Sequence, residues 1–156
     1  SKKVYNHINS RRSMPKKKDV DKIEKEIIFA NRIFLIKCEG KKSVEVCDNF
    51  FGLISEYEEK IENLMDSCDI PEQVILNFKK GNPELAALYH IQSKEISRHL
   101  IAIDIYTNQL VNFAEQERKE ELLHSFIHEL IHHKYKDEVK TDYLTKKFLK
   151  EKFGIE

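Results

Sequence analysis

The chain has few residues that interrupt regular secondary structure and no long apolar run. Four glycines and three prolines occur among 156 residues, 35% of which are charged. This composition is typical of a compact, helix-rich protein, and enrichment in lysine and glutamate is common in proteins from hot environments. No apolar stretch approaches the roughly 20 residues of a transmembrane helix, and nothing resembles a signal peptide. We therefore expect a cytoplasmic protein without a membrane span.

Cysteine is also scarce, and its arrangement argues against two kinds of site. Cys38, Cys47 and Cys68 are an odd number without CxxC spacing. Neither a structural zinc site nor a disulfide framework is expected from this pattern, and we predict reduced, buried thiols. With 40% apolar residues, a chain of this length can bury one core and a small helical appendage.

The most informative motif is the HExxH sequence at residues 128–132. Residues four apart lie on the same face of a helix, so His128 and His132 can bind one metal ion. Glu129 lies roughly 100° around the helix from His128, beside the ion without binding it. That position suits a general base acting on a zinc-bound water. The motif therefore predicts a zinc hydrolase site.

The residues around the motif fit a pair of helices. Apolar residues recur at three-to-four spacing over residues 115–135, which predicts one helix. Acidic residues crowd its first turns and basic residues its last, as the helix dipole favours. Asp137 fits the N-cap of a second helix that ends at Gly154. A tight turn is expected between the two helices.

Two carboxylates at the start of the second helix complete the candidate site. Glu138 is the nearest candidate for the third protein ligand, which a catalytic zinc site needs while it keeps one position open. Asp142 lies one helical turn beyond Glu138, on the same face. We predict that it contacts the outer nitrogen of His128, where a carboxylate fixes the tautomer of a ligand histidine.

The sequence HELIHH followed by ExxxD resembles the gluzincin metallopeptidases. The short, lysine-rich chain around it resembles the archaeal minigluzincins in particular, and these are similar to the catalytic cores of membrane peptidases of the HtpX and CAAX-processing kind. The resemblance covers residues 87–154. It implies an α+β fold with a zincin-like minimal catalytic core, in which a small sheet lies over an HExxH helix and a glutamate helix.

The same resemblance implies a role for each site residue. Zn²⁺ would be bound by His128, His132 and Glu138, with Glu129 as general base and acid. Asp142 would be the outer aspartate of the glutamate helix. The spacer between His132 and Glu138 has five residues, fewer than most gluzincins use. Asp142 as a direct ligand, as in the aspzincins, therefore stays an alternative.

Two segments before the motif have the composition of strands. Residues 87–91 and 99–106 are rich in β-branched and aromatic side chains. One of them is expected to be an edge strand that pairs with an extended peptide. His133 is expected to be a helix-end cation, and His124 a structural histidine or a residue of the cleft. Candidate donors to the oxyanion, each of which also has a purely structural interpretation, are His90, His99, Tyr106 and Tyr143.

The N-terminal half is expected to be helical. The predicted helices cover residues 19–34, 44–65 and 69–78, with a break at Gly40 between the first two. The predicted organisation is a basic flexible arm at residues 1–18, a helical N-terminal region at 19–85 and the zincin-like catalytic core at 86–156.

The basic arm has seven lysines and arginines and no acidic residue, so its formal charge is +7. The rest of the chain carries −7, because the whole sums to zero. A solvated tail is the expected interpretation, and contact with nucleic acid or with an acidic part of another chain is the alternative. An acidic body with a basic arm also favours self-association.

Together these features predict a zinc-dependent endopeptidase that acts on peptides or proteins. Its resemblance to proenzymes raises the hypothesis that it is latent, with a residue from the first 85 blocking the metal as a removable ligand. Two alternatives stay open. One is a catalytically silent or regulatory zinc-binding protein of the zincin fold, and the other is a nucleic-acid-associated protein that uses the basic arm.

Overall fold

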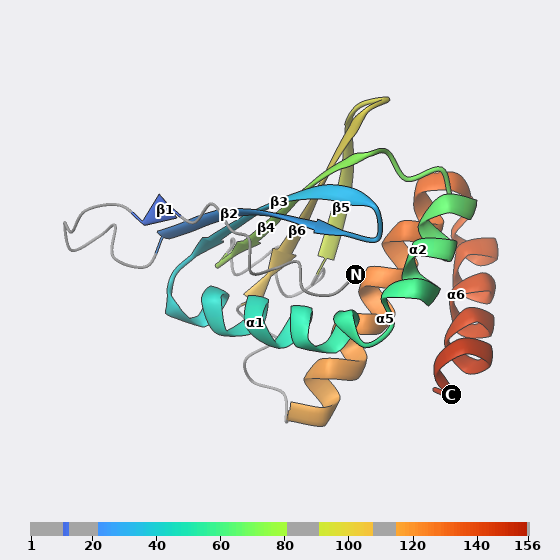
Figure 1. Cartoon of the computed structure of the whole chain (residues 1–156). Helices are drawn as coiled ribbons and strands as arrows, with labels where there is room; N and C mark the ends of the chain where they lie inside the picture. The colour runs from blue at the N-terminus through green and yellow to red at the C-terminus, as the bar shows by residue number, and fades with distance from the viewer. Residues whose placement is uncertain (1–10, 13–21, 81–90, 108–114, 156) are drawn as a thin grey trace.

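The computed structural model describes residues 11–12, 22–80, 91–107 and 115–155. These residues form an α+β fold in which helices pack on one face of a mixed sheet (Figure 1). The sheet has the strand order β1-β2-β3-β4-β6-β5. Its strands are β1 (Arg11–Arg12), β2 (Lys22–Phe29), β3 (Arg32–Glu39), β4 (Gln73–Lys79), β5 (Ile91–Ser97) and β6 (Leu100–Tyr106). The helices are α1 (Lys41–Ser55), α2 (Glu58–Ser67), α5 (Glu115–Lys134) and α6 (Glu138–Phe153).

The helix predicted over residues 19–34 is wrong, because strands β2 and β3 form an antiparallel hairpin there. Ala30 and Asn31 join the strands, with φ values of 53° and 60°. Positive φ at both positions is the conformation of a tight two-residue hairpin turn. Residues of β3 alternate between buried and exposed or half-buried, as expected for a strand that buries one face. The isoleucines of this segment have a spacing that also fits a helix, which is why the sequence alone was misleading.

The helix predicted over residues 69–78 is also wrong, because this segment contains the central strand β4. It pairs in parallel with β3 on one side and with β6 on the other. Val74, Leu76 and Phe78 are buried against the helices. The region 19–85 is therefore not all helical, and it supplies three strands of the sheet.

The single helix predicted over residues 44–65 is two helices, α1 and α2, which are separated at Glu56 and Tyr57. Gly40 does interrupt the chain, as predicted, but it separates strand β3 from α1 rather than two helices. Its φ of 91° belongs to the region that only glycine adopts readily.

Three of the elements predicted for the C-terminal half, one strand and two helices, are confirmed. Strand β6 and helix α5 lie where the sequence placed them. The side chain of Asp137 caps α6 by accepting a hydrogen bond from the backbone N–H of Val139, and Gly154 ends that helix with a left-handed conformation. Of the strand predicted over residues 87–91, only Ile91 lies within the described residues, where it begins β5.

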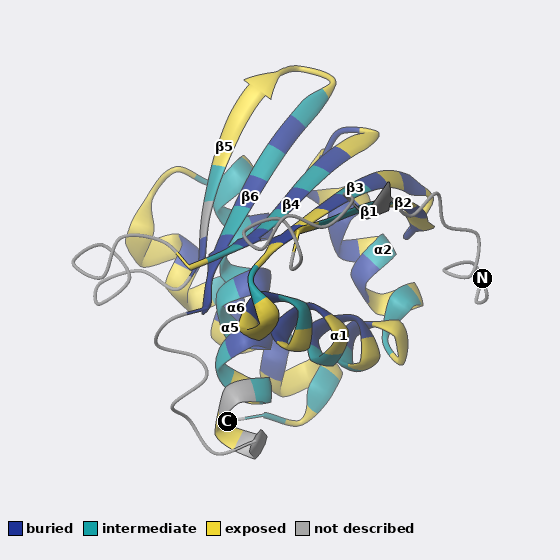
Figure 2. Ribbon diagram, turned by 90° about the vertical axis from the view of Figure 1, so that its left-hand side faces the viewer, coloured by how far each residue is buried: buried dark blue, intermediate teal, exposed yellow. Residues whose placement is uncertain are grey.

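One hydrophobic core joins the two halves of the chain. Phe50 of α1 lies with its ring centroid 5.8 Å from that of Phe78 in β4 and 5.0 Å from that of Phe126 in α5. Buried residues run through the middle of the sheet and the helices beneath it, whereas the β5 end carries exposed residues (Figure 2). The segments 19–85 and 86–156 thus share one sheet and one core.

Most of the predicted arm lies outside the described residues. Within it, Arg11 and Arg12 form the short strand β1, which pairs with Glu24 and Ile23 of β2. As for membrane insertion, the described part of the chain contains no helix whose length and apolar content would let it cross a bilayer.

Candidate metal centre

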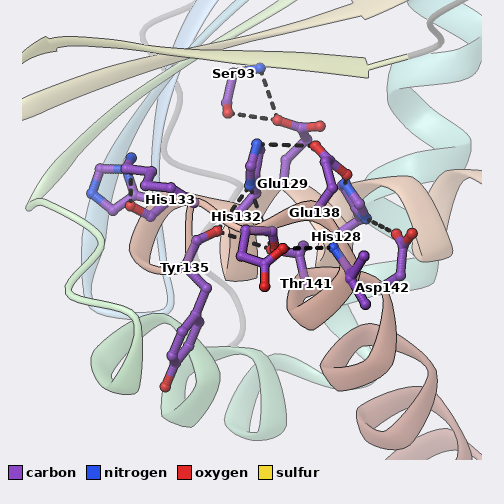
Figure 3. Close-up of polar contacts among 12 residues, drawn as sticks. Ser93, His128, Glu129, His132, His133, Tyr135, Glu138, Thr141 and Asp142 are labelled. Carbon is purple, nitrogen blue, oxygen red and sulfur yellow. Dashed lines mark hydrogen bonds and ion pairs between the residues drawn. The ribbon is translucent and has the colours of Figure 1, made fainter.

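Helices α5 and α6 bring the predicted metal ligands together beneath the β5 end of the sheet (Figure 3). His128 and His132 lie one turn apart on α5, and their side chains are half-buried. Only three residues, 135–137, separate α5 from α6. Glu138 is the first residue of α6, so the Asp137 cap sets its position directly.

Both imidazoles face the Glu138 carboxylate. The Nε2 atom of His128 lies 3.5 Å from Oε1 of Glu138, and Nε2 of His132 lies 3.2 Å from Oε2. Zinc binds nitrogen and carboxylate oxygen at about 2.0–2.2 Å in tetrahedral geometry, which places ligand atoms about 3.3 Å apart. The measured N–O separations match this value, and the donor types are those that zinc prefers. The spacing and donor types of each histidine with Glu138 are therefore compatible with a metal ion, although the two histidines face different oxygens of the carboxylate.

The opposite nitrogen of each histidine faces an oxygen atom. Nδ1 of His128 lies 3.3 Å from Oδ1 of Asp142, and Nδ1 of His132 donates to the carbonyl oxygen of Tyr135 at 2.9 Å. In a histidine that binds a metal through Nε2, such an outer contact holds the proton on Nδ1. Asp142 thus occupies the position behind His128 that its spacing predicted.

The geometry also bears on the alternative ligand Asp142. Ligand atoms of His128, Glu138 and Asp142 all lie within 4.8 Å of one another, a set that leaves out His132. However, Asp142 faces Nδ1 of His128, whereas both imidazole Nε2 atoms face Glu138. An ion on the Nε2 side would lie on the opposite edge of the His128 ring from Asp142. Glu138, and not Asp142, therefore lies on the Nε2 side of both histidines.

Glu129, the predicted general base, is held by a residue that the sequence did not single out. Its Oε1 atom accepts hydrogen bonds from the hydroxyl of Ser93 at 2.6 Å and from the backbone N–H of Ser93 at 3.1 Å. Ser93 lies on β5, the last strand in the sheet order. Because its N–H points to Glu129 and not to β6, the outer edge of β5 faces the site (Figure 3).

Thr141 is a second residue that the motif did not reveal. Its side chain is fully buried, and its Oγ1 atom lies 2.9 Å from the carbonyl oxygen of Tyr135 and 3.4 Å from Nδ1 of His132. The sequence gives only a weak indication that Thr141 is buried. It is one of three residues that recur every four positions and form the buried stripe of α6, namely Thr141, Thr145 and Leu149.

The other candidate residues lie apart from this group or outside the described residues. His90 is outside them. His99 contacts Glu72 through Nδ1 at 3.0 Å, in the turn at the tip of the β5–β6 hairpin. Tyr106 donates to Asp104 at 3.4 Å. Tyr143, on α6, is exposed. None of these contacts shows a donor aimed at the candidate site.

Two further histidines and the cysteines are at least partly buried. Burial lowers the pKa of His124 and of His133, and the positive charge of Lys136 lowers the pKa of His133 further. The lowered pKa disfavours the helix-end cation that the sequence predicted for His133. The three cysteines are free and buried, as predicted. Within the described ranges, the group of possible metal ligands contains no cysteine, so a blocking residue stays a hypothesis.

Comparison of the chain with protein-family models, with curated proteins and with solved structures gave no match. The geometry of α5 and α6 and the resemblance of the HExxH and ExxxD motifs are therefore the basis for assigning a function.

Proposed function

We propose that the protein is a zinc-dependent endopeptidase of the minigluzincin type. The observation that carries this proposal is the convergence of three side chains at the α5–α6 junction. Nε2 atoms of His128 and His132 face one carboxylate, that of Glu138, at 3.5 and 3.2 Å. Each histidine also has an oxygen atom at Nδ1, an arrangement that is common among metal-binding histidines.

A zinc ion bound by these residues supplies Lewis acidity, which lowers the pKa of water and polarises a peptide carbonyl. The protein's own part in proton transfer falls to Glu129. Ser93 holds its Oε1 atom through two hydrogen bonds, so the other carboxylate oxygen takes the proton of the attacking water. The same carboxyl group then delivers that proton to the leaving amine.

The outer edge of β5 is the proposed binding site for the peptide backbone. An extended segment can add to an exposed strand edge through main-chain hydrogen bonds, and β5 lies at one end of the sheet order. Because Ser93 of this strand contacts Glu129, a peptide that adds to β5 would lie close to the proton-transferring carboxylate. This arrangement favours peptides and unfolded protein segments as substrates.

The test combines metal analysis with the substitution Glu129→Gln. We expect the unchanged chain to bind one equivalent of zinc and to cleave a mixture of peptides in a zinc-dependent way. Glu129→Gln should keep the zinc and lose about a hundredfold or more in kcat, because a general base contributes about 10²–10⁴-fold. Mass spectrometry of the peptide mixture measures cleavage, and elemental analysis measures zinc.

Each contrary result has its own meaning. A chain that binds no zinc excludes the metal centre. A chain that binds zinc but cleaves as fast after the Glu129→Gln substitution as before it has a different catalytic group. A chain that binds zinc without any cleavage favours a silent or regulatory zinc-binding protein.

A further inference from the structure

We propose that Thr141 is a positioning residue for the metal centre: its hydroxyl holds the Tyr135 carbonyl against His132 and so selects the imidazole nitrogen that faces Glu138. This inference rests on the proposed function. Thr141 lies on α6 and is fully buried. It has no direct contact with the Nε2 side of either histidine among those described, so its effect on the ligands is indirect.

The contacts of Thr141 define which nitrogen of His132 carries the proton. A carbonyl oxygen only accepts hydrogen bonds, and the Tyr135 carbonyl lies 2.9 Å from Nδ1 of His132. The proton must therefore be on Nδ1. Oγ1 of Thr141 lies 3.4 Å from the same nitrogen and 2.9 Å from the Tyr135 carbonyl, so the hydroxyl can donate to that carbonyl while its oxygen offers a second acceptor to Nδ1–H.

The same hydroxyl also braces the short connection between α5 and α6. Oγ1 lies 2.9 Å from the carbonyl oxygen of Asp137 as well as from that of Tyr135, and its single proton can serve one of them at a time. Main-chain hydrogen bonds lie on both sides of this contact. The Tyr135 N–H donates to the carbonyl of Ile131, and the Thr141 N–H donates to the carbonyl of Asp137. Thr141 thus ties the end of the histidine helix to the start of the glutamate helix.

Without this hydroxyl, the Tyr135 carbonyl would lose one of its two donors and the connection would lose its central link. Because the Tyr135 carbonyl would no longer be fixed against Nδ1, the His132 ring could then also adopt the tautomer with the proton on Nε2, which cannot bind a metal until that proton leaves. We therefore expect Thr141 to affect zinc affinity rather than the general base.

The experiment compares Thr141→Val with Thr145→Val in the full chain. Thr145 is a matched control because it is equally buried on the same helix, and its hydroxyl donates to the carbonyl of Thr141 at 2.7 Å within α6. Thr141→Ser is the rescue variant, since it keeps the hydroxyl. Zinc affinity is measured by competition with a chromophoric chelator. The His132 tautomer is read in the metal-free protein by ¹⁵N NMR of the imidazole, at a pH where the ring is neutral.

We expect Thr141→Val to bind zinc about ten- to a hundredfold more weakly, the loss that outer contacts of metal ligands typically cause. The metal-free variant should show a mixture of His132 tautomers, while Thr145→Val and Thr141→Ser stay close to the unchanged chain in both measurements. If Thr141→Val unfolds, Thr141→Ala takes its place with the same two measurements.

The inference is overturned if Thr141→Val matches Thr145→Val in both zinc affinity and tautomer. Failure of the proposed function has a different signature, because there the unchanged chain binds no zinc. The tautomer comparison needs no metal, so in that case it still decides whether Thr141 sets the tautomer of His132.

Discussion

At the residue scale, the candidate site depends on which side of each imidazole is occupied by an oxygen atom. Asp142 takes Nδ1 of His128, and the Tyr135 carbonyl takes Nδ1 of His132. Both Nε2 atoms are thereby directed to Glu138. A carboxylate contacts Nδ1 of His128, whereas a neutral carbonyl contacts Nδ1 of His132. Loss of the outer contact should therefore weaken zinc binding to a different extent for the two histidines.

Substitution of the two carboxylates separates their roles. Asp142→Asn should lower zinc affinity by about ten- to a hundredfold, because it removes the charge behind His128 but no ligand atom. Glu138→Gln should cost more, since it removes the charged oxygen that faces both Nε2 atoms. Zinc titration of the two variants under one set of conditions gives the comparison. A larger loss for Asp142→Asn would identify Asp142 as the direct ligand.

These residues could be located from the sequence because each pair lies on one helix, one turn apart. His128 and His132 are four residues apart, and so are Glu138 and Asp142. Ser93 could not be found in that way. It lies 36 residues from Glu129 along the chain and reaches it only after β5 has joined the sheet.

At the scale of elements, the C-terminal helices were predictable because their signals are local: an apolar stripe, the Asp137 cap and the Gly154 stop. Strands β3 and β4 were not. Strand β4 lies between β3 and β6 and pairs in parallel with both, although β3 ends at Glu39 and β6 begins only at Leu100. Parallel pairing joins segments that are far apart in the sequence, so no local pattern reveals it. The spacing of isoleucines in β2 and β3 is compatible with the period of a helix as well as with that of a strand.

The β2–β3 turn offers a test of the corrected N-terminal fold. Asn31 is exposed and adopts a φ of 60°, a conformation that costs most side chains about 1 kcal/mol or more. Asn31→Ala should therefore lower the free energy of unfolding by about 1 kcal/mol, as measured by urea denaturation. Asn31→Gly is the control, and it should be as stable as the unchanged chain.

A helix at this position would reverse that order, because alanine favours a helix and glycine disfavours it. Stabilisation by Asn31→Ala together with destabilisation by Asn31→Gly would contradict the hairpin.

At the scale of the whole molecule, the sheet links the two predicted regions of the chain. Strands β2, β3 and β4 come from residues before 85, and they lie in the same sheet as β5 and β6. Phe34, Phe50 and Phe78 from that first region are fully buried in the common core. Residues 19–85 therefore contribute to the support of the candidate site, whether or not they also regulate it.

Truncation tests this dependence. A fragment of residues 86–156 keeps only β5 and β6 of the sheet, and an isolated pair of strands is marginally stable at best. We expect that fragment to show no cooperative thermal unfolding by circular dichroism. Removal of residues 1–21 is the matched control, because β2 and all later elements remain, and cooperative unfolding should persist. A fragment 86–156 that melts cooperatively would show that the core folds without the first three long strands.

The hydrogen bonds from Ser93 to Glu129 connect the edge strand β5 to helix α5. In the proposed endopeptidase, a peptide bound along β5 would contact the strand whose Ser93 holds the Glu129 carboxylate, so a shift of β5 on binding would also move that carboxylate. A ligand that cannot bind in an extended conformation along the outer edge of β5 would leave Glu129 in place.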